Sequence, residues 1–203
     1  MKGDGYRYAL ELAWKGLTCR GLEEAARNAP AHLDDGRLTL SFLGREAVVD
    51  ARSRTVSVGG KGAATMETML VLHYLAGVGA AVPSSEWTSF LQLPGGHAYY
   101  GAFKRRIIDE VASLFQHRPG SLLAAAMRLG GKRLSMGDAS VRLDVFPKVP
   151  VAVVVWAGDD EMDGSANVLF DRSAPLHLPV EDLAEIGTLV LDMLSRAVEA
   201  LSN

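Results

Sequence analysis

The amino-acid sequence predicts an α+β fold: a mostly antiparallel sheet in two strand groups, at about residues 37–58 and 140–171, packed with helices and with helices at both termini. Two observations carry this prediction. The β-rich runs gather in two groups instead of alternating singly with helices, and helical periodicity occupies both ends of the chain. The 203 residues, 48% of them apolar, can bury a core, so we expect residues 1–203 to form a single α+β domain.

The first half of the chain begins with a helical pattern. From Tyr6 to Asn28, apolar residues recur at the i, i+3, i+4 spacing of an amphipathic helix, Gly21 allows a bend before residues 22–29, and Pro30 ends it. Between residues 37 and 58, three short β-rich runs are separated by turn residues, which predicts a three-stranded antiparallel meander. Residues 65–76 are apolar over most of a helical surface, so we expect this helix to be central.

Two further helices are expected in the middle of the chain. Residues 84–96 mix aromatic and turn residues, which indicates a structured connection. An apolar stripe predicts a helix from about residue 98 to residue 115. A second, shorter helix over residues 122–129 ends at a pair of glycines.

The second strand group precedes the last helix. Residues 140–146 alternate between apolar and polar, which predicts a half-buried strand, whereas residues 151–156 are continuously apolar and predict a central one. Residues 168–170 should return antiparallel to that strand. Residues 181–201 then predict an amphipathic helix with carboxylates at its positive end.

Composition excludes several classes of function. The net charge is −3 and the basic residues are scattered, so we expect no nucleic-acid partner. A single cysteine, Cys19, excludes an internal disulfide and an all-cysteine cluster or zinc site within one chain, and it favours the reducing cytoplasm. No apolar run approaches the ~18 residues of a membrane span, so we expect neither secretion nor a membrane.

An acidic loop follows the predicted central strand. It carries four carboxylates: Asp159, Asp160, Glu161 and Asp163. Their spacing matches the first half of a calcium loop, but Phe170 stands where the bidentate glutamate is needed, so we expect no metal. The interpretation we favour is a polar hairpin loop in which one carboxylate caps backbone amides. The alternative is a paired carboxylate, such as Asp160 with Glu161, acting as a general acid or base.

A candidate pocket is predicted around the start of the helix near residue 98. His97 should sit at the helix N-terminus, where an anion is favoured, with basic residues including Arg105 further along. Tyr99 and Tyr100 could flank a planar ligand, and Trp87 could supply an apolar wall. The competing interpretation is a capped helix whose aromatic residues join the core and whose basic residues face water.

Other motifs favour ordinary structure. His73 lies on an apolar helix, where a core histidine is more common than an axial ligand to haem or a corrin. The other histidines lack paired ligand spacing, so a zinc site is not expected. The glycines of residues 58–65 lack the spacing of a phosphate-binding loop, and we see no complete nucleophile triad.

Several motifs together resemble a known family. They are Leu72-His-Tyr-Leu75, Glu86-Trp-Thr-Ser-Phe90, Leu93-Pro-Gly-Gly96, Trp156-Ala-Gly-Asp-Asp-Glu161, Leu169-Phe-Asp171 and Leu178-Pro-Val-Glu-Asp182. Across nearly the whole chain the sequence is similar to an uncharacterised prokaryotic family built on a domain of unknown function. The resemblance implies a setting in anaerobic metabolism, because members occur largely in anaerobes and some are fused to an iron–sulfur cluster domain.

We therefore expect a cytoplasmic accessory protein of anaerobic metabolism that binds a ligand or cofactor whose identity the sequence does not reveal. The first alternative is a metal- or carboxylate-dependent enzyme centred on the acidic loop, residues 158–171. The second is an interaction module for an iron–sulfur or corrinoid partner. The expected ligand-binding residues are Trp87, His97, Tyr99, Tyr100, Arg105, Asp159, Asp160 and Glu161.

Overall fold

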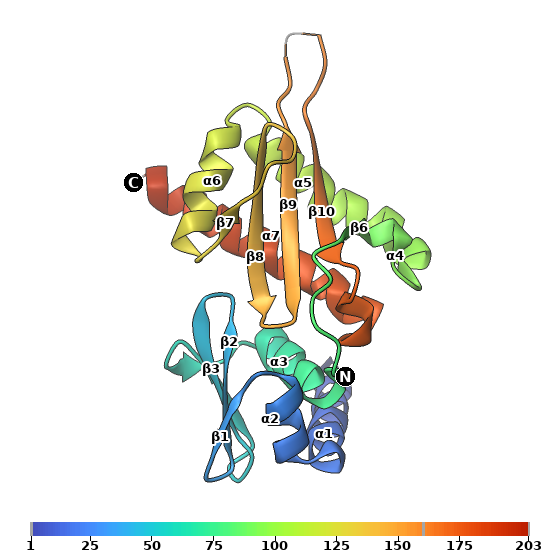
Figure 1. The fold of residues 1–203 in the computed structure, drawn as a ribbon, viewed down its shortest axis with the longest axis vertical. Coiled ribbons are helices and arrows are strands. Elements are labelled where there is room, and N and C mark those ends of the chain that lie inside the picture. Colours follow the sequence, from blue (N-terminus) through green and yellow to red (C-terminus); the bar gives the residue numbers. More distant parts are fainter. Residues whose placement is uncertain (1, 160, 203) are drawn as a thin grey trace.

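The computed structural model describes residues 2–159 and 161–202 and confirms the α+β fold. Within these ranges, the strands form two five-stranded antiparallel sheets, with helices at both ends of the chain (Figure 1). Asp160 lies outside the described residues. Among the residues described, no helix is both long enough and apolar enough to cross a membrane.

The first sheet is a meander in the order β1-β2-β3-β4-β5. The three predicted strands are its middle three, and two short edge strands were not predicted because two or three residues carry no readable alternation. The predicted first helix is two helices, separated at Gly21, whose φ of 85° no helical residue adopts. The elements are α1 (Lys2–Arg20), α2 (Leu22–Asn28), β1 (His32–Asp34), β2 (Arg37–Phe42), β3 (Arg45–Asp50), β4 (Thr55–Val58), β5 (Lys61–Gly62) and α3 (Thr65–Gly77).

The second half of the chain builds the second sheet and the helices around it. The expected connection over residues 84–96 contains a short strand, and the helix expected over residues 98–115 is α-helical at its ends and π-helical between. The elements are β6 (Trp87–Ser89), η1 (Phe90–Gln92), α4 (Gly96–Phe103), the π turn η2 (Lys104–Ile108), α5 (Asp109–Phe115), α6 (Pro119–Arg128), β7 (Lys132–Arg133), β8 (Ala139–Phe146), β9 (Val149–Trp156), β10 (Ser165–Asp171), η3 (Ala174–Leu176) and α7 (Val180–Ser202).

The strand predicted to be central, β9, lies in the middle of the second sheet, whose order is β6-β10-β9-β8-β7. Its residues from 149 to 155 are all buried, as the unbroken apolar run requires. Helices α5 and α7 pass behind this sheet (Figure 1). The register places Trp156 opposite Ser165 at one end of β10 and Trp87 opposite Asp171 at the other end.

Aromatic packing and backbone bonding join the two sheets. The ring of Phe146 on β8 lies 4.9 Å from that of Phe42 on β2 and stacks at 4.1 Å on Tyr74 of α3. The Leu43 N–H donates to the Val145 carbonyl at 3.0 Å. Because these contacts are buried, one apolar cluster contains residues from both sheets.

Polar side chains reinforce the same junction. His73 of α3 and Asp182 of α7 are joined by a hydrogen bond, with Nδ1 2.8 Å from Oδ2. The buried Lys148 donates from Nζ to the carbonyls of Gly79 and Ala80, which lie just after α3. His73, which was predicted to be a core residue, is therefore half-buried and hydrogen-bonded to a carboxylate. Polar groups between packed helices normally have such a partner.

Candidate functional site

A groove lies where α4 and the π turn pack against α7. The two helical segments approach closely at Gly187, where an added Cβ would stand 2.7 Å from Cε2 of Phe103 and 3.1 Å from Cδ1 of Ile107. Only a residue without a side chain permits this approach. Single π turns inside α-helices are uncommon and often occur at functional sites. The π turn therefore supports this groove as a candidate site.

The groove encloses a cavity of about 190 Å³. Its floor is apolar and its walls carry hydroxyl groups and charges of both signs. The lining residues are Tyr99, Ala102, Phe103, Arg106, Ile107, Glu181, Ala184, Glu185 and Thr188. An apolar pocket with a few polar groups at fixed places is the usual form of a small-molecule site.

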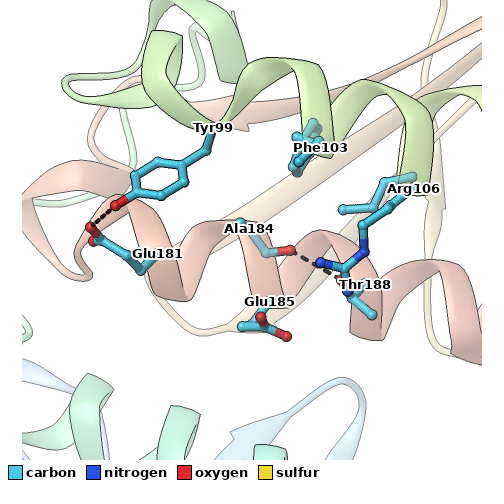
Figure 2. Close-up of a pocket in the computed structure, with 9 residues that line it drawn as sticks. Tyr99, Phe103, Arg106, Glu181, Ala184, Glu185 and Thr188 are labelled. Atoms are coloured by element: carbon cyan, nitrogen blue, oxygen red, sulfur yellow. Dashed lines mark hydrogen bonds between the residues drawn. The ribbon is translucent and has the colours of Figure 1, made fainter.

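One end of the groove is closed by a hydrogen bond between its two walls. The Tyr99 hydroxyl donates to Oε1 of Glu181 at 2.9 Å (Figure 2). The carboxylate raises the pKa of Tyr99, so the phenol stays protonated at neutral pH. Because its proton is committed to Glu181, the phenolic oxygen offers a ligand only an acceptor.

The other end of the groove carries a positive side chain that forms no ion pair with a described residue, with the Glu185 carboxylate also lining the cavity. Arg106 belongs to the π turn, and Figure 2 shows its side chain reaching from that segment toward Thr188 on α7. Among the described residues, no hydrogen bond or ion pair involves the Arg106 guanidinium. A guanidinium has five donors in a planar fork, a geometry that matches a carboxylate.

The residues predicted around His97 separate into different places. Tyr99 lines the groove, whereas Tyr100 is half-buried against the core. His97 is exposed in the first turn of α4 and does not line the groove. Arg105 is exposed and does not line it either, whereas the next residue, Arg106, does.

Trp87 lines a different depression, together with Leu93 and Leu176. That depression has a volume of about 580 Å³, and its arginine, Arg172, is already paired with Glu86 at 2.9 Å. Because its cation is neutralised, it is the weaker candidate for an anionic ligand. The structure thus does not bring Trp87 and Tyr99 into one pocket.

The acidic loop joins β9 to β10 and uses one carboxylate for its own structure. Oδ1 of Asp159 accepts backbone N–H groups from Glu161 at 2.9 Å and from Met162 at 2.8 Å. These bonds lower the pKa of Asp159. This is the capped hairpin loop that the sequence favoured. Among the described residues, no group of three or more His, Cys, Asp or Glu side chains is arranged to hold a metal ion.

The acidic loop and His97 lie at opposite ends of one long helical segment. The Gly158 N–H at the base of the loop donates to the carbonyl of Gln116, directly after α5. At about 1.5 Å per residue, Gln116 lies roughly 25–30 Å along the helix axis from His97. The two therefore do not form one site, and no described residue of the loop lines the groove.

Arg106 and the residues from α7 were not predicted as site residues. Arg106 was identifiable, because it lies seven positions after Tyr99 and so shares its helical face, whereas Arg105 does not. In the sequence of α7, the one feature that relates to the groove is the i, i+3, i+4, i+7 spacing of the residues that line it. Those residues are Glu181, Ala184, Glu185 and Thr188.

Comparison with known proteins gives a family. The family model described as "Domain of unknown function (DUF3786)" matches residues 21–193, which include every residue that lines the groove. Searches of curated proteins and of solved structures each found no match. Since the family model covers most of the sequence, the chain belongs to the DUF3786 family, a domain of unknown function.

Proposed function

We propose that this protein binds a small carboxylate in the groove between α4 and α7. The observation that carries the proposal is Arg106, a permanently charged side chain that lines an apolar-floored cavity and has no partner among the described residues. A carboxylate there would gain a charge-assisted, bidentate pair. The apolar body of the ligand would lie against Phe103 and Ile107, where it leaves water.

The far end of the groove limits what the other end of the ligand can be. Tyr99 and Glu181 present only acceptors, and Glu181 is negatively charged. A second carboxylate at that end would be repelled, whereas a hydroxyl or ammonium group would be bound. The proposed ligand is therefore short, with a carboxylate at one end, an apolar middle and a hydrogen-bond donor at the other end.

The test is calorimetric titration with short monocarboxylic acids, their ω-hydroxy and ω-amino derivatives, and the matching primary amides. We expect the ω-substituted acids to bind best and the amides to bind at least about tenfold more weakly, since the charge-assisted pair is lost. A ligand at 100 times its Kd should also stabilise the protein by about 2.7 kcal/mol against thermal unfolding.

The matched variants are Arg106→Gln and Arg105→Gln. Both residues are exposed on the π turn and lose the same charge, but only Arg106 lines the groove. Arg106→Gln should remove binding and Arg105→Gln should leave it unchanged. The proposal fails if no carboxylate of the series binds, or if both variants weaken binding equally.

We also propose that this binding serves an accessory role in the cytoplasm of organisms with anaerobic metabolism. The support is the resemblance of sequence motifs and the use of a single cysteine, Cys19. Native mass spectrometry of protein purified without oxygen would identify a co-purified small acid. Recovery of a haem, corrinoid or metal instead would contradict the proposed ligand class.

A second candidate function, an interaction module, is favoured by the β9–β10 hairpin. It projects beyond the second sheet at the end away from the first sheet (Figure 1). Trp156 and Met162 are two large apolar side chains on this one hairpin, 42% and 73% exposed. A photo-crosslinker at Met162 should capture a partner that one at Met127, 75% exposed on α6, does not capture. Identical products at both positions would count against this function.

A further inference from the structure

A second cavity lies between the first sheet and the C-terminal half of α7. Its volume is about 410 Å³, more than twice that of the groove. Three cationic side chains from three separate elements line it: Arg45 on β3, Lys61 on β5 and Arg196 on α7. Two carboxylates, Glu67 and Asp192, also line it.

The charges in this cavity are only partly compensated. Nη2 of Arg45 lies 2.7 Å from Oε1 of Glu67, whose other oxygen accepts the Ala64 N–H at 3.0 Å. Glu67 is thus fully committed. The side chains of Lys61 and Arg196 have no ion pair or hydrogen bond with any described residue. The cavity is therefore net positive, in a chain whose overall charge is −3.

One polar atom in the cavity wall also lacks a partner. Nε of Arg45 is buried, and no acceptor for it lies among the described residues. Buried donors are normally satisfied, so an unpaired N–H of this kind is uncommon. The remaining wall includes Met66 and Met193, whose flexible apolar side chains adapt to varied ligand shapes.

We propose that this cavity binds a phosphorylated small molecule. The phosphate would lie between Lys61 and Arg196, two cations that form no ion pair with a described residue, and the organic part would lie against the methionines. A phosphate suits the site better than a carboxylate, because its charge near −2 at neutral pH pairs with two cations at once. This site is independent of the groove, because the two share no lining residue.

The experiment titrates the full chain with phenyl phosphate and with inorganic phosphate, at constant ionic strength set with chloride. We expect both to bind and phenyl phosphate to bind more tightly, because only it contacts the apolar wall. Equal affinity would restrict the site to inorganic phosphate and overturn the proposed organic ligand. The absence of binding at about 1 mM of either would overturn the site itself.

The variants are Lys61→Gln and Arg196→Gln, with Arg133→Gln as the matched control. Arg133 lies on β7, is exposed, and does not line this cavity. Each of the first two should weaken phenyl phosphate binding by at least about fivefold, and the control should not. Equal effects of all three would show nonspecific attraction and overturn the proposal.

Two further variants keep the test decisive if a glutamine variant folds poorly. Lys61→Arg and Arg196→Lys conserve charge and should retain binding, whereas loss of binding in both would contradict a site based on charge. Arg106→Gln should leave phosphate binding unchanged, so that a failure here is distinguishable from a failure of the carboxylate groove.

Discussion

Asp171, at the end of β10, is the residue whose replacement should destabilise the fold most clearly by electrostatics alone. Its side chain is completely buried and accepts five hydrogen bonds. Oδ1 accepts the backbone N–H and hydroxyl of both Ser84 and Ser173, at 2.6 to 3.0 Å. Oδ2 accepts the backbone N–H of Ser85 at 2.7 Å. The carboxylate thereby fixes the chain that leads into β6.

The two oxygens of Asp171 accept different numbers of hydrogen bonds. Asp171→Asn and Asp171→Ala should therefore lower the free energy of unfolding by different amounts. Asp171→Asn keeps the acceptor for four donors and places an NH₂ group against the Ser85 N–H, so one unsatisfied donor should cost about 1–3 kcal/mol. Asp171→Ala leaves three backbone N–H groups without an acceptor, and at roughly 1–2 kcal/mol each the cost should be about 3–6 kcal/mol. The serine hydroxyls can rotate elsewhere and add little.

The assay is urea unfolding followed by circular dichroism, with Asp34→Asn as the control. Asp34 is exposed on β1, so its replacement should change the free energy of unfolding by less than about 0.5 kcal/mol. The reasoning would be refuted if Asp171→Asn were as stable as the control, or if Asp171→Ala cost less than Asp171→Asn.

The pH dependence of stability gives an independent measure of the same carboxylate. Burial by itself raises the pKa of Asp171, but hydrogen bonds from Ser173 and Ser84 outweigh burial and lower it overall. A lowered pKa in the folded state means that the unfolded state binds more protons below about pH 4. The stabilisation is therefore present above the unfolded pKa and is lost as the pH falls through the folded pKa. Asp171→Asn should lack this acid-dependent loss.

The remaining predictions concern α7 and its partners. The hydrogen bond to Asp182 raises the pKa of His73. The stabilisation of the fold by this pair is therefore present below about pH 6.5 and is lost as the pH rises through the pKa of the folded state. His73→Ala should remove this pH dependence of the free energy of unfolding, which is no more than about 1 kcal/mol because the ring is partly exposed. Gly187→Ala should cost about 1–3 kcal/mol in urea unfolding, because its Cβ would overlap Phe103. Gly101→Ala, a helical glycine with open space around it, should instead be neutral or stabilising, and equal effects of the two would contradict the packing argument.

Prediction from sequence succeeded where a pattern is long enough to be periodic. The apolar run of residues 151–156 identified β9, and alternation over residues 140–146 identified β8. The short edge strands β1, β5, β6 and β7 were not predicted, because each is two or three residues long and exists only through pairing with a neighbour. Such strands follow from tertiary structure and have no local signal.

Of the residues that line the groove, only Tyr99 on α4 was among the predicted site residues. Tyr99 was singled out from local composition, but its partner Glu181 comes from a helix 82 residues later, and only packing brings the two together. The expected site residues include Arg105, whereas Arg106 lines the groove, and the spacing from Tyr99 indicates which of the two shares its helical face. Whether His97 and the acidic loop form one site was left open by the sequence, and the long helical segment between them holds the two apart.

The two proposed ligands would share α7 without sharing a face of it. The groove is lined from residues 181 to 188 and the second cavity from residues 189 to 196, with the same i, i+3, i+4, i+7 spacing in each. A displacement of eight residues moves about 12 Å along the axis and turns the lining face by about 80°. One set of side chains therefore meets α4 and the other meets the first sheet. Changes that far apart with no common contact act additively. Arg106→Gln should therefore remove carboxylate binding and leave phosphate binding intact, and Arg196→Gln should weaken phosphate binding and leave carboxylate binding intact.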